Sequence, residues 1–207
     1  MTFRLLCAGM LLLAAAGGCR RTAPDDRRYL EETLADRRLK DSLFRSDPES
    51  PFLHDSSLQF RGLSWYDPDP AYYFRSKLYR YRTPEKVTIT GTKGEERKAV
   101  RYGYFLLPYN GNLYTLNVYK TGDRLPDGRE PLSVWFTDET TGKETYHVGR
   151  YVDVGDEQAD PNASYIINLN TAYNPYCAYS SRYSCAVPLK EDHLPFAVTA
   201  GEKNYHP

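Results

Sequence analysis

The feature that most limits the fold is a series of short segments rich in Tyr, Val, Thr and Ile, separated by turn residues. The clearest pair is Val100–Leu107 and Leu113–Tyr119, joined by a link that contains Pro, Asn and Gly. Such a link between two β-prone segments predicts a β-hairpin. Further strands are expected at residues 87–90, 132–136, 145–154, 165–169 and 196–199. Short strands with mostly hairpin connections predict a mainly β protein, an antiparallel β-sandwich or barrel.

One helix is expected before the strands. Residues 27–45 lack Gly and Pro and are rich in Leu, Glu, Arg and Lys, whereas residues 46–51 contain two prolines that end the pattern. The leucines of this segment fall on two different faces, so we expect the helix to dock only through its C-terminal half. Residues 27–207 are therefore predicted to form a single globular domain, with an N-terminal helix followed by β structure.

The N-terminus has the pattern of an export signal. Met1–Arg4 carries one positive charge, Leu5–Ala16 is an apolar run, and Gly17-Gly18-Cys19 follows. A charged start, an apolar run of this length and a small-residue exit are typical of a secretory signal peptide, here residues 1–18. Twelve residues rise only ~18 Å as a helix, too little to cross ~30 Å of hydrocarbon.

Cys19 is the predicted lipidation site. A cysteine after two glycines at this place resembles a bacterial lipobox, in which the thiol receives diacylglycerol. Residues 19–26 would then form a lipidated tether, and the lipid would hold the protein on a membrane. The alternative is ordinary cleavage after Ala14-Ala15-Ala16, which would leave a soluble secreted protein. Because Arg20 is not the Asp that retains some lipoproteins in the inner membrane, we expect a periplasm-facing protein of the outer membrane.

Composition excludes two broad classes of function. Lys and Arg total 27, Asp and Glu total 27, and the formal net charge is zero. Nucleic-acid binding relies on an excess of basic residues, so no nucleic-acid partner is expected. A multi-span membrane protein would need several apolar runs of about 20 residues, which the chain lacks.

Two cysteines remain once Cys7 leaves with the signal and Cys19 carries lipid. Cys177 and Cys185 are expected to form a disulfide, because the count is even and the compartment is oxidising. Two free thiols, or half of a metal site with His193, stay open as alternatives. Their spacing is weak support for a metal, so no metal site is predicted. The sequence also lacks the common phosphate-binding, zinc-protease and serine-hydrolase motifs, and no cofactor is expected.

The segment between residues 138 and 202 is the densest in polar and Tyr residues. Together with segments upstream it resembles the uncharacterised bacterial and archaeal family known as domain-of-unknown-function family 1684. The resemblance covers most of the mature chain, and it is strongest at Gly149-Arg150-Tyr151, Asn170, Ala172-Tyr-Asn-Pro175, Cys177-Ala-Tyr179, Cys185 and Ala200-Gly-Glu202. Upstream it includes Lys40-Asp41 with Phe44, Phe60-Arg-Gly-Leu63 and Arg101-Tyr-Gly103. The chain departs from the family pattern at Asn168-Leu169, where Asp-Phe is usual, and at Tyr176 and Ala186, where Pro is usual. The family has no agreed activity. The resemblance therefore implies a fold and a functional region, but no particular reaction.

The same region supplies the candidate ligand-binding residues. They are polar or aromatic types that are costly to bury unless paired: Arg101, Arg150, Tyr151, Asn170, Asn174 and Glu202. Arg, Asn and Tyr together suit a carboxylate, a sugar or a peptide end, and Tyr173 and Tyr179 could add flat walls. The structural alternative is that Arg150 is buried and paired with Glu144 or Glu202, with Asn170 and Asn174 closing the same network. Glu202 is the favoured partner, because Glu144 lies six residues and ~20 Å away along an extended strand.

The sequence thus predicts a lipid-anchored protein of the bacterial cell envelope. Its partners would be the membrane, through Cys19, and a small polar ligand or another envelope protein. A non-catalytic binding or structural module fits best. The alternative is a periplasmic hydrolase that uses a Glu and an Arg of the same cluster, which would need an open site within hydrogen-bond reach of Glu144 or Glu202.

Overall fold

The computed structural model describes residues 25–55 and 57–205 of the 207-residue chain. Helix α1 spans Asp25–Ser46 and the short α2 spans Pro51–His54. The strands that follow are β1 (Tyr73–Lys77), β2 (Tyr79–Thr90), β3 (Glu96–Tyr109), β4 (Asn112–Lys120), β5 (Trp135–Asp138), β6 (Arg150–Tyr151), β7 (Ser164–Asn168) and β8 (His193–Leu194). Single 3₁₀ turns occur at Pro70–Tyr72, Leu169–Thr171, Tyr176–Ala178 and Lys190–Asp192. The predicted signal peptide and the lipidation site Cys19 lie outside the described residues.

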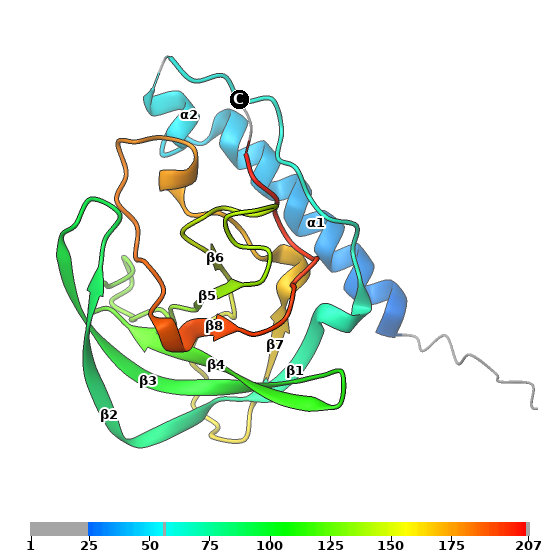
Figure 1. The fold of residues 1–207 in the computed structure, drawn as a ribbon, viewed down its shortest axis with the longest axis vertical. Helices are drawn as coiled ribbons and strands as arrows, with labels where there is room; N and C mark the ends of the chain where they lie inside the picture. The colour runs from blue at the N-terminus through cyan, green and yellow to red at the C-terminus, as the bar shows by residue number, and fades with distance from the viewer. Residues whose placement is uncertain (1–24, 56, 206–207) are drawn as a thin grey trace, which may run out of the picture.

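Small, mostly antiparallel sheets make up the β part, as the sequence predicts. The largest is the meander β2-β3-β4, beside the pair β1-β7 and the sheet β6-β5-β8, in which β5 and β8 run parallel. The β3-β4 turn is the predicted hairpin: Asn110 and Gly111 both take positive φ angles, +48° and +77°, as a tight hairpin turn requires. The sheets formed by the described residues do not close into a barrel. Figure 1 shows α1 on one side of the molecule and β2–β4 on the opposite side.

The main apolar core lies between these sheets. It is built by alternate residues of β3 and β4 and by side chains of β5, β7 and the C-terminal segment; members that are essentially unexposed include Phe105, Leu107, Val118, Ile167 and Val198. Burial of this many large side chains, at about 1.5–3 kcal/mol each, is the main stabilising contribution. A smaller cluster around Phe44, Phe52 and Tyr179 joins α1 and α2 to the rest.

Helix α1 docks along more of its length than the sequence predicts. Tyr29 and Thr33, in its N-terminal half, are buried together with Arg37 and Phe44. The expectation was wrong because polar side chains make the contact: Thr33 accepts a hydrogen bond from Asn168 at 2.9 Å, and Arg37 donates to backbone carbonyls. A search for an apolar stripe does not find a helix face of this kind.

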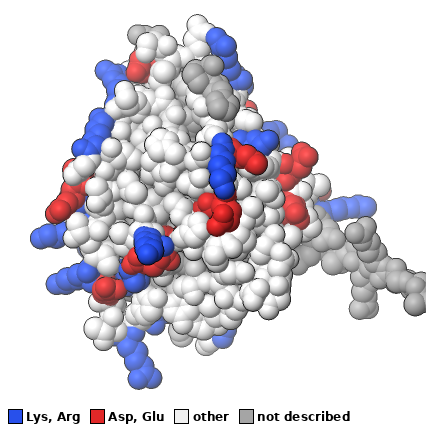
Figure 2. Space-filling model, in the orientation of Figure 1, with Lys and Arg blue, Asp and Glu red and all other residues white. Residues whose placement is uncertain are grey.

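The charged side chains on the surface do not form a large patch of one sign on the face shown in Figure 2. In Figure 2, acidic and basic side chains are interspersed around a broad uncharged area. Among the described residues, no helix is both long enough and apolar enough to cross a membrane.

Candidate functional site

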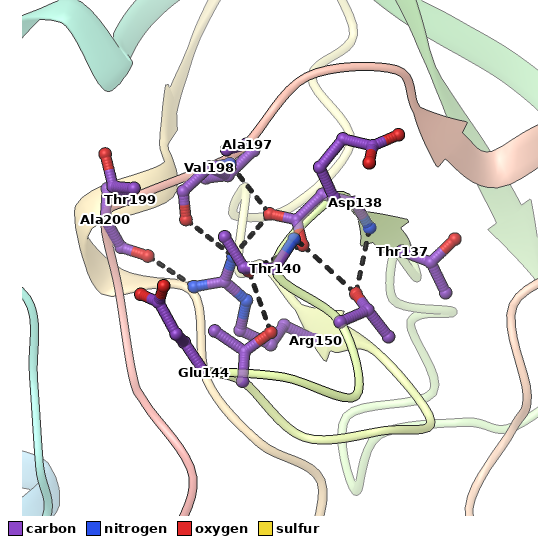
Figure 3. Close-up of polar contacts among 12 residues, drawn as sticks. Thr137, Asp138, Thr140, Glu144, Arg150, Ala197, Val198, Thr199 and Ala200 are labelled. Atoms are coloured by element: carbon purple, nitrogen blue, oxygen red, sulfur yellow. Dashed lines mark hydrogen bonds and ion pairs between the residues drawn. The ribbon is translucent and has the colours of Figure 1, made fainter.

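Arg150 lies at the centre of a buried polar cluster. Its side chain is 1% exposed, and its Nη2 donates to Asp138 Oδ2 at 2.8 Å and to the carbonyl of Val198 at 2.9 Å. Nη1 donates to the carbonyl of Ala200. Asp138 also accepts from the backbone N–H of Val198, at 2.9 Å, and from the Thr140 hydroxyl (Figure 3). The ion pair therefore ties the end of β5, strand β6 and the C-terminal segment together.

The acidic partner of Arg150 differs from both predicted partners. Glu144 accepts a hydrogen bond from Tyr66 instead, and only the backbone carbonyl of Glu202 approaches Arg150, at 3.4 Å. Asp138 is the partner because β5 pairs antiparallel with β6, with Phe136 opposite Arg150. Distances along one strand do not reveal a partner on the neighbouring strand. Burial lowers the pKa of Arg150, and the Asp138 carboxylate opposes this effect.

Glu202 is the centre of a second buried cluster. Its side chain is unexposed, and its carboxylate accepts from the Asn174 backbone N–H (3.1 Å), the Asn174 side-chain amide (2.9 Å), the Tyr179 hydroxyl and Lys40 Nζ (3.5 Å). Burial raises the pKa of Glu202, while Lys40 and the hydrogen-bond donors oppose this effect. The predicted association of Asn174 with Glu202 is present. A general acid or base must reach a substrate, whereas this carboxylate is enclosed by its own donors.

Two glycines allow the arginine and the glutamate to reach these positions. Gly149, before Arg150, has φ +115°, and a Cβ there would lie 2.5 Å from the carbonyl oxygen of Phe136. Gly201, before Glu202, has φ +79°, and a Cβ would lie 2.7 Å from the carbonyl oxygen of Ala172. Positive φ and such close backbone approach both require glycine. The Gly-Arg and Gly-Glu pairs of the sequence therefore serve the packing of the two clusters.

The other predicted polar residues lie elsewhere. Asn170 is unexposed; its carbonyl accepts from Arg37 at 2.8 Å, and its side-chain amide exchanges two hydrogen bonds with the backbone of Asp69. Arg101, on β3, forms ion pairs with Glu85 at 3.1 Å and with Glu191. The structure thus divides the predicted polar site into separate clusters, most of them in the interior.

Tyr151 is the predicted residue that lines a cavity. A hollow of about 570 Å³ lies beside β6 and the loop that follows Tyr173. Its aromatic lining consists of Trp135, Tyr151, Tyr173, Tyr176 and Tyr183. We call this hollow the aromatic cavity. Tyr151 and Tyr173 exchange two backbone hydrogen bonds of 2.9 Å, which fix their rings 6.1 Å apart. Sequence reasoning included Tyr151 and Tyr173 but missed Trp135, Tyr176 and Tyr183; the density of Tyr between residues 173 and 183 is the signal that could have found the last two.

A third buried carboxylate, which sequence reasoning also missed, orients Trp135. Asp192 accepts from the Trp135 indole N–H (3.2 Å), the Tyr119 hydroxyl (2.7 Å) and the Asn117 amide (2.8 Å). Burial raises the pKa of Asp192, and these donors oppose the effect. Because the indole is held and also stacks on Tyr119 with ring centroids 4.8 Å apart, this wall of the cavity is preorganised.

The predicted disulfide is absent from the structure, in which Cys177 and Cys185 are free thiols. They are nevertheless neighbours, since the Cys177 backbone N–H lies 3.2 Å from Cys185 Sγ. His193 lies against Thr137 and Glu139 and is not part of this pair. Nowhere in residues 25–55 and 57–205 do three metal-ligating side chains gather.

The reduced cysteine pair should react unequally. A hydrogen bond from the Cys185 thiol lowers the pKa of Cys177 to about 6, whereas the same contact raises the pKa of Cys185. At pH 7 we expect iodoacetamide to alkylate Cys177 first, with a half-maximal rate near pH 6, because the thiolate is the nucleophile. Peptide mass spectrometry across pH 5–9 measures this. Removing the donor by Cys185→Ala should raise the midpoint, and equal labelling of both thiols in the wild type would contradict the expectation.

Comparisons with known proteins agree with the family resemblance of the sequence. A protein-family model described as "Protein of unknown function (DUF1684)" matches residues 58–203. Among solved structures, the chain is similar to an uncharacterised protein of Haloarcula marismortui, studied by solution NMR. The two are 30% identical, the match covers 86% of this chain and 96% of that chain, and the TM-score is 0.63. No curated protein matches the chain. The matched range contains Arg150, Glu202 and every residue that lines the aromatic cavity.

Proposed function

This chain belongs to the DUF1684 family of proteins of unknown function, and from that premise we propose that it is a lipid-anchored, non-catalytic binding module of the bacterial cell envelope. In this proposal the aromatic cavity holds a small polar ligand, a sugar or a peptide end. The buried clusters around Arg150 and Glu202 form the rigid frame of the cavity. Lipid on Cys19 holds the protein at the membrane, facing the periplasm.

The observation that carries the binding proposal is the aromatic cavity. Its volume is within the usual range of ligand sites, and its lining combines flat aromatic walls with a few polar groups. Tyr and Trp offer large contact areas with polar tips, at little cost in conformational entropy. Tyr176 is also 38% exposed although it lies in the cavity wall, an exposure that a bound ligand would reduce.

The experiment uses the intrinsic fluorescence of Trp135. The purified mature protein, in detergent and carrying Trp65→Phe, is titrated with soluble glycopeptides released from bacterial cell wall. We expect a saturable change in Trp135 emission, and binding about tenfold weaker in Tyr176→Ala, because wall aromatics contribute most at such sites. Tyr79→Ala is the matched control, since Tyr79 is similarly exposed (41%) but lies outside the cavity. Equal weakening by both variants, or no change in emission, would count against the proposal.

The anchor has its own expected outcome. Mass spectrometry of protein extracted from membranes should find a diacylglyceryl adduct on Cys19 as the first residue, because the residues before it have the pattern of a lipoprotein signal. Cys19→Ser should move the protein out of the membrane fraction. A soluble wild-type protein that starts at Gly17 would contradict the anchor.

We extend the proposal to the cysteine pair. In an oxidising periplasm, Cys177 and Cys185 would become a disulfide by exchange with a disulfide oxidoreductase: the Cys177 thiolate attacks the oxidoreductase disulfide, Cys185 resolves the mixed disulfide, and the oxidoreductase leaves as a dithiol. What supports this is the proximity of the two sulfur-bearing residues. Since Cys185 lines the aromatic cavity, the bond would stiffen one wall of it.

A further inference from the structure

We infer that the ligand is a peptide segment with a positively charged group at one end and a carboxylate at the other, lying along three neighbouring hollows with the aromatic cavity in the middle. This inference rests on the proposed function and names the ligand class for the same site. It depends on the lining residues that neighbouring hollows share and on the charges of the two outer hollows.

The aromatic cavity shares lining residues with a hollow on each side. Tyr173 and Tyr176 also line a second hollow of about 370 Å³, next to α1. Lys98, Ala99 and Thr121 also line a third hollow of about 520 Å³, beside β2 and β3. The second and third hollows share no lining residue, so the aromatic cavity lies between them.

The hollow next to α1 is acidic. Three carboxylates line it, those of Asp36, Asp47 and Asp153, against one ammonium group, that of Lys40. Lys40 already pairs with Glu202, and its Nζ lies 3.7 Å from the centre of the Tyr173 ring. Desolvation raises the pKa of Asp36, and the negative charge of Asp153 adds to this effect. A ligand cation would relieve the repulsion between these carboxylates.

The hollow beside β2 and β3 is basic. Lys86, Lys98 and Lys120 line it, against one carboxylate, that of Glu130. Lys120 is paired with Glu157 at 2.8 Å. Lys86 and Lys98 form no ion pair with any residue that the structure describes. Two lysines at one end of a groove suit a carboxylate.

The order of charges selects a peptide over other polar ligands. A free amino group or a basic side chain matches the acidic end, a carboxylate matches the basic end, and aromatic walls suit the chain between them. A neutral glycan would satisfy the rings and leave both charged ends without a partner. A uniformly anionic polymer would be repelled at the acidic end.

The test uses tetra-alanine with free ends, and the same peptide N-acetylated or C-amidated. Binding to the mature protein in detergent is followed by Trp135 emission in the Trp65→Phe background. For the wild type we expect each blocked end to weaken binding about tenfold, as the loss of one charge-assisted contact predicts. In Asp36→Asn the effect of N-acetylation should become smaller, and in Lys98→Ala the effect of C-amidation should become smaller, because each variant removes one of the charges at that end. Glu31→Gln, an exposed substitution on the same helix, is the control and should change nothing.

The outcomes separate this inference from the proposed function. Equal binding of all three peptides, or blocking effects that are undiminished in the variants, would overturn the inference of a peptide with two charged ends. If cell-wall glycopeptides change Trp135 emission while no tetra-alanine peptide does, the inference fails, but the proposed function stands. If neither probe changes Trp135 emission, both fail.

Discussion

Replacing Arg150 by methionine should lower the free energy of unfolding by about 3–5 kcal/mol, the usual result of removing one partner of a buried ion pair. The variant would leave Asp138 as a buried carboxylate without its cation, and the carbonyls of Val198 and Ala200 without a donor. Chemical denaturation of wild type and variant under the same conditions measures the difference. If the variant folds but leaves apolar surface exposed, the slope of its unfolding free energy against denaturant concentration should be smaller than that of the wild type.

Arg129→Met is the matched control for this substitution. Arg129 also forms ion pairs, with Asp127 at 2.5 Å and with Asp156, but its side chain is 54% exposed. Exposed ion pairs contribute about 0–1 kcal/mol. A loss at Arg150 no larger than the loss at Arg129 would mean that the buried cluster does not stabilise the domain.

The second large effect is expected at Glu202. Glu202→Ala removes the acceptor for Lys40, Asn174 and Tyr179, and it leaves the Lys40 ammonium largely buried without its partner. We expect a loss of about 3–5 kcal/mol in the free energy of unfolding. Glu202→Gln keeps the shape and should lose less, because one amide oxygen can still accept. Equal stability of Glu202→Ala and the wild type would contradict this account.

The pH dependence of this effect has a defined sign. Burial raises the pKa of Glu202 in the folded protein above the value of about 4.5 expected for the unfolded chain. As the pH rises through the interval between the two values, the unfolded chain loses its proton first, so the contribution of Glu202 to stability falls. Wild type should therefore lose stability relative to Glu202→Gln as the pH rises above about 4.5. A gain over the same interval would show that the donors outweigh burial.

Local patterns in the sequence were sufficient to predict the hairpin, helix α1 and part of the buried clusters around Arg150 and Glu202. The hairpin of β3 and β4 followed from the Asn-Gly turn, and α1 followed from its composition. The burial of Arg150 and the contact between Asn174 and Glu202 agree with the structural alternative drawn from the sequence. These features depend on neighbours in the chain or on residue types that must be paired when buried.

Features that depend on distant pairing could not be predicted. The expected strand at residues 145–154 is reduced to Arg150–Tyr151, and the expected strand at residues 196–199 is an irregular segment tied to Asp138. Strand β1 was missed because its partner is β7, far along the chain. The aromatic cavity was missed for the same reason, since Trp135 and Tyr183 meet only when β5 and the loop after Tyr173 fold together.

The central claim is that ligand binding takes place in the aromatic cavity and that the Arg150 and Glu202 clusters are its frame. The most direct measurement follows the Trp135 indole N–H and the Arg150 Nε–H together by ¹H–¹⁵N NMR during titration with cell-wall glycopeptides. The Trp135 signal should move with saturation, while the Arg150 signal, from a side chain that is 1% exposed, should keep its position. A saturable shift of Arg150 with Trp135 unchanged would contradict the claim and would put the ligand in the polar cluster.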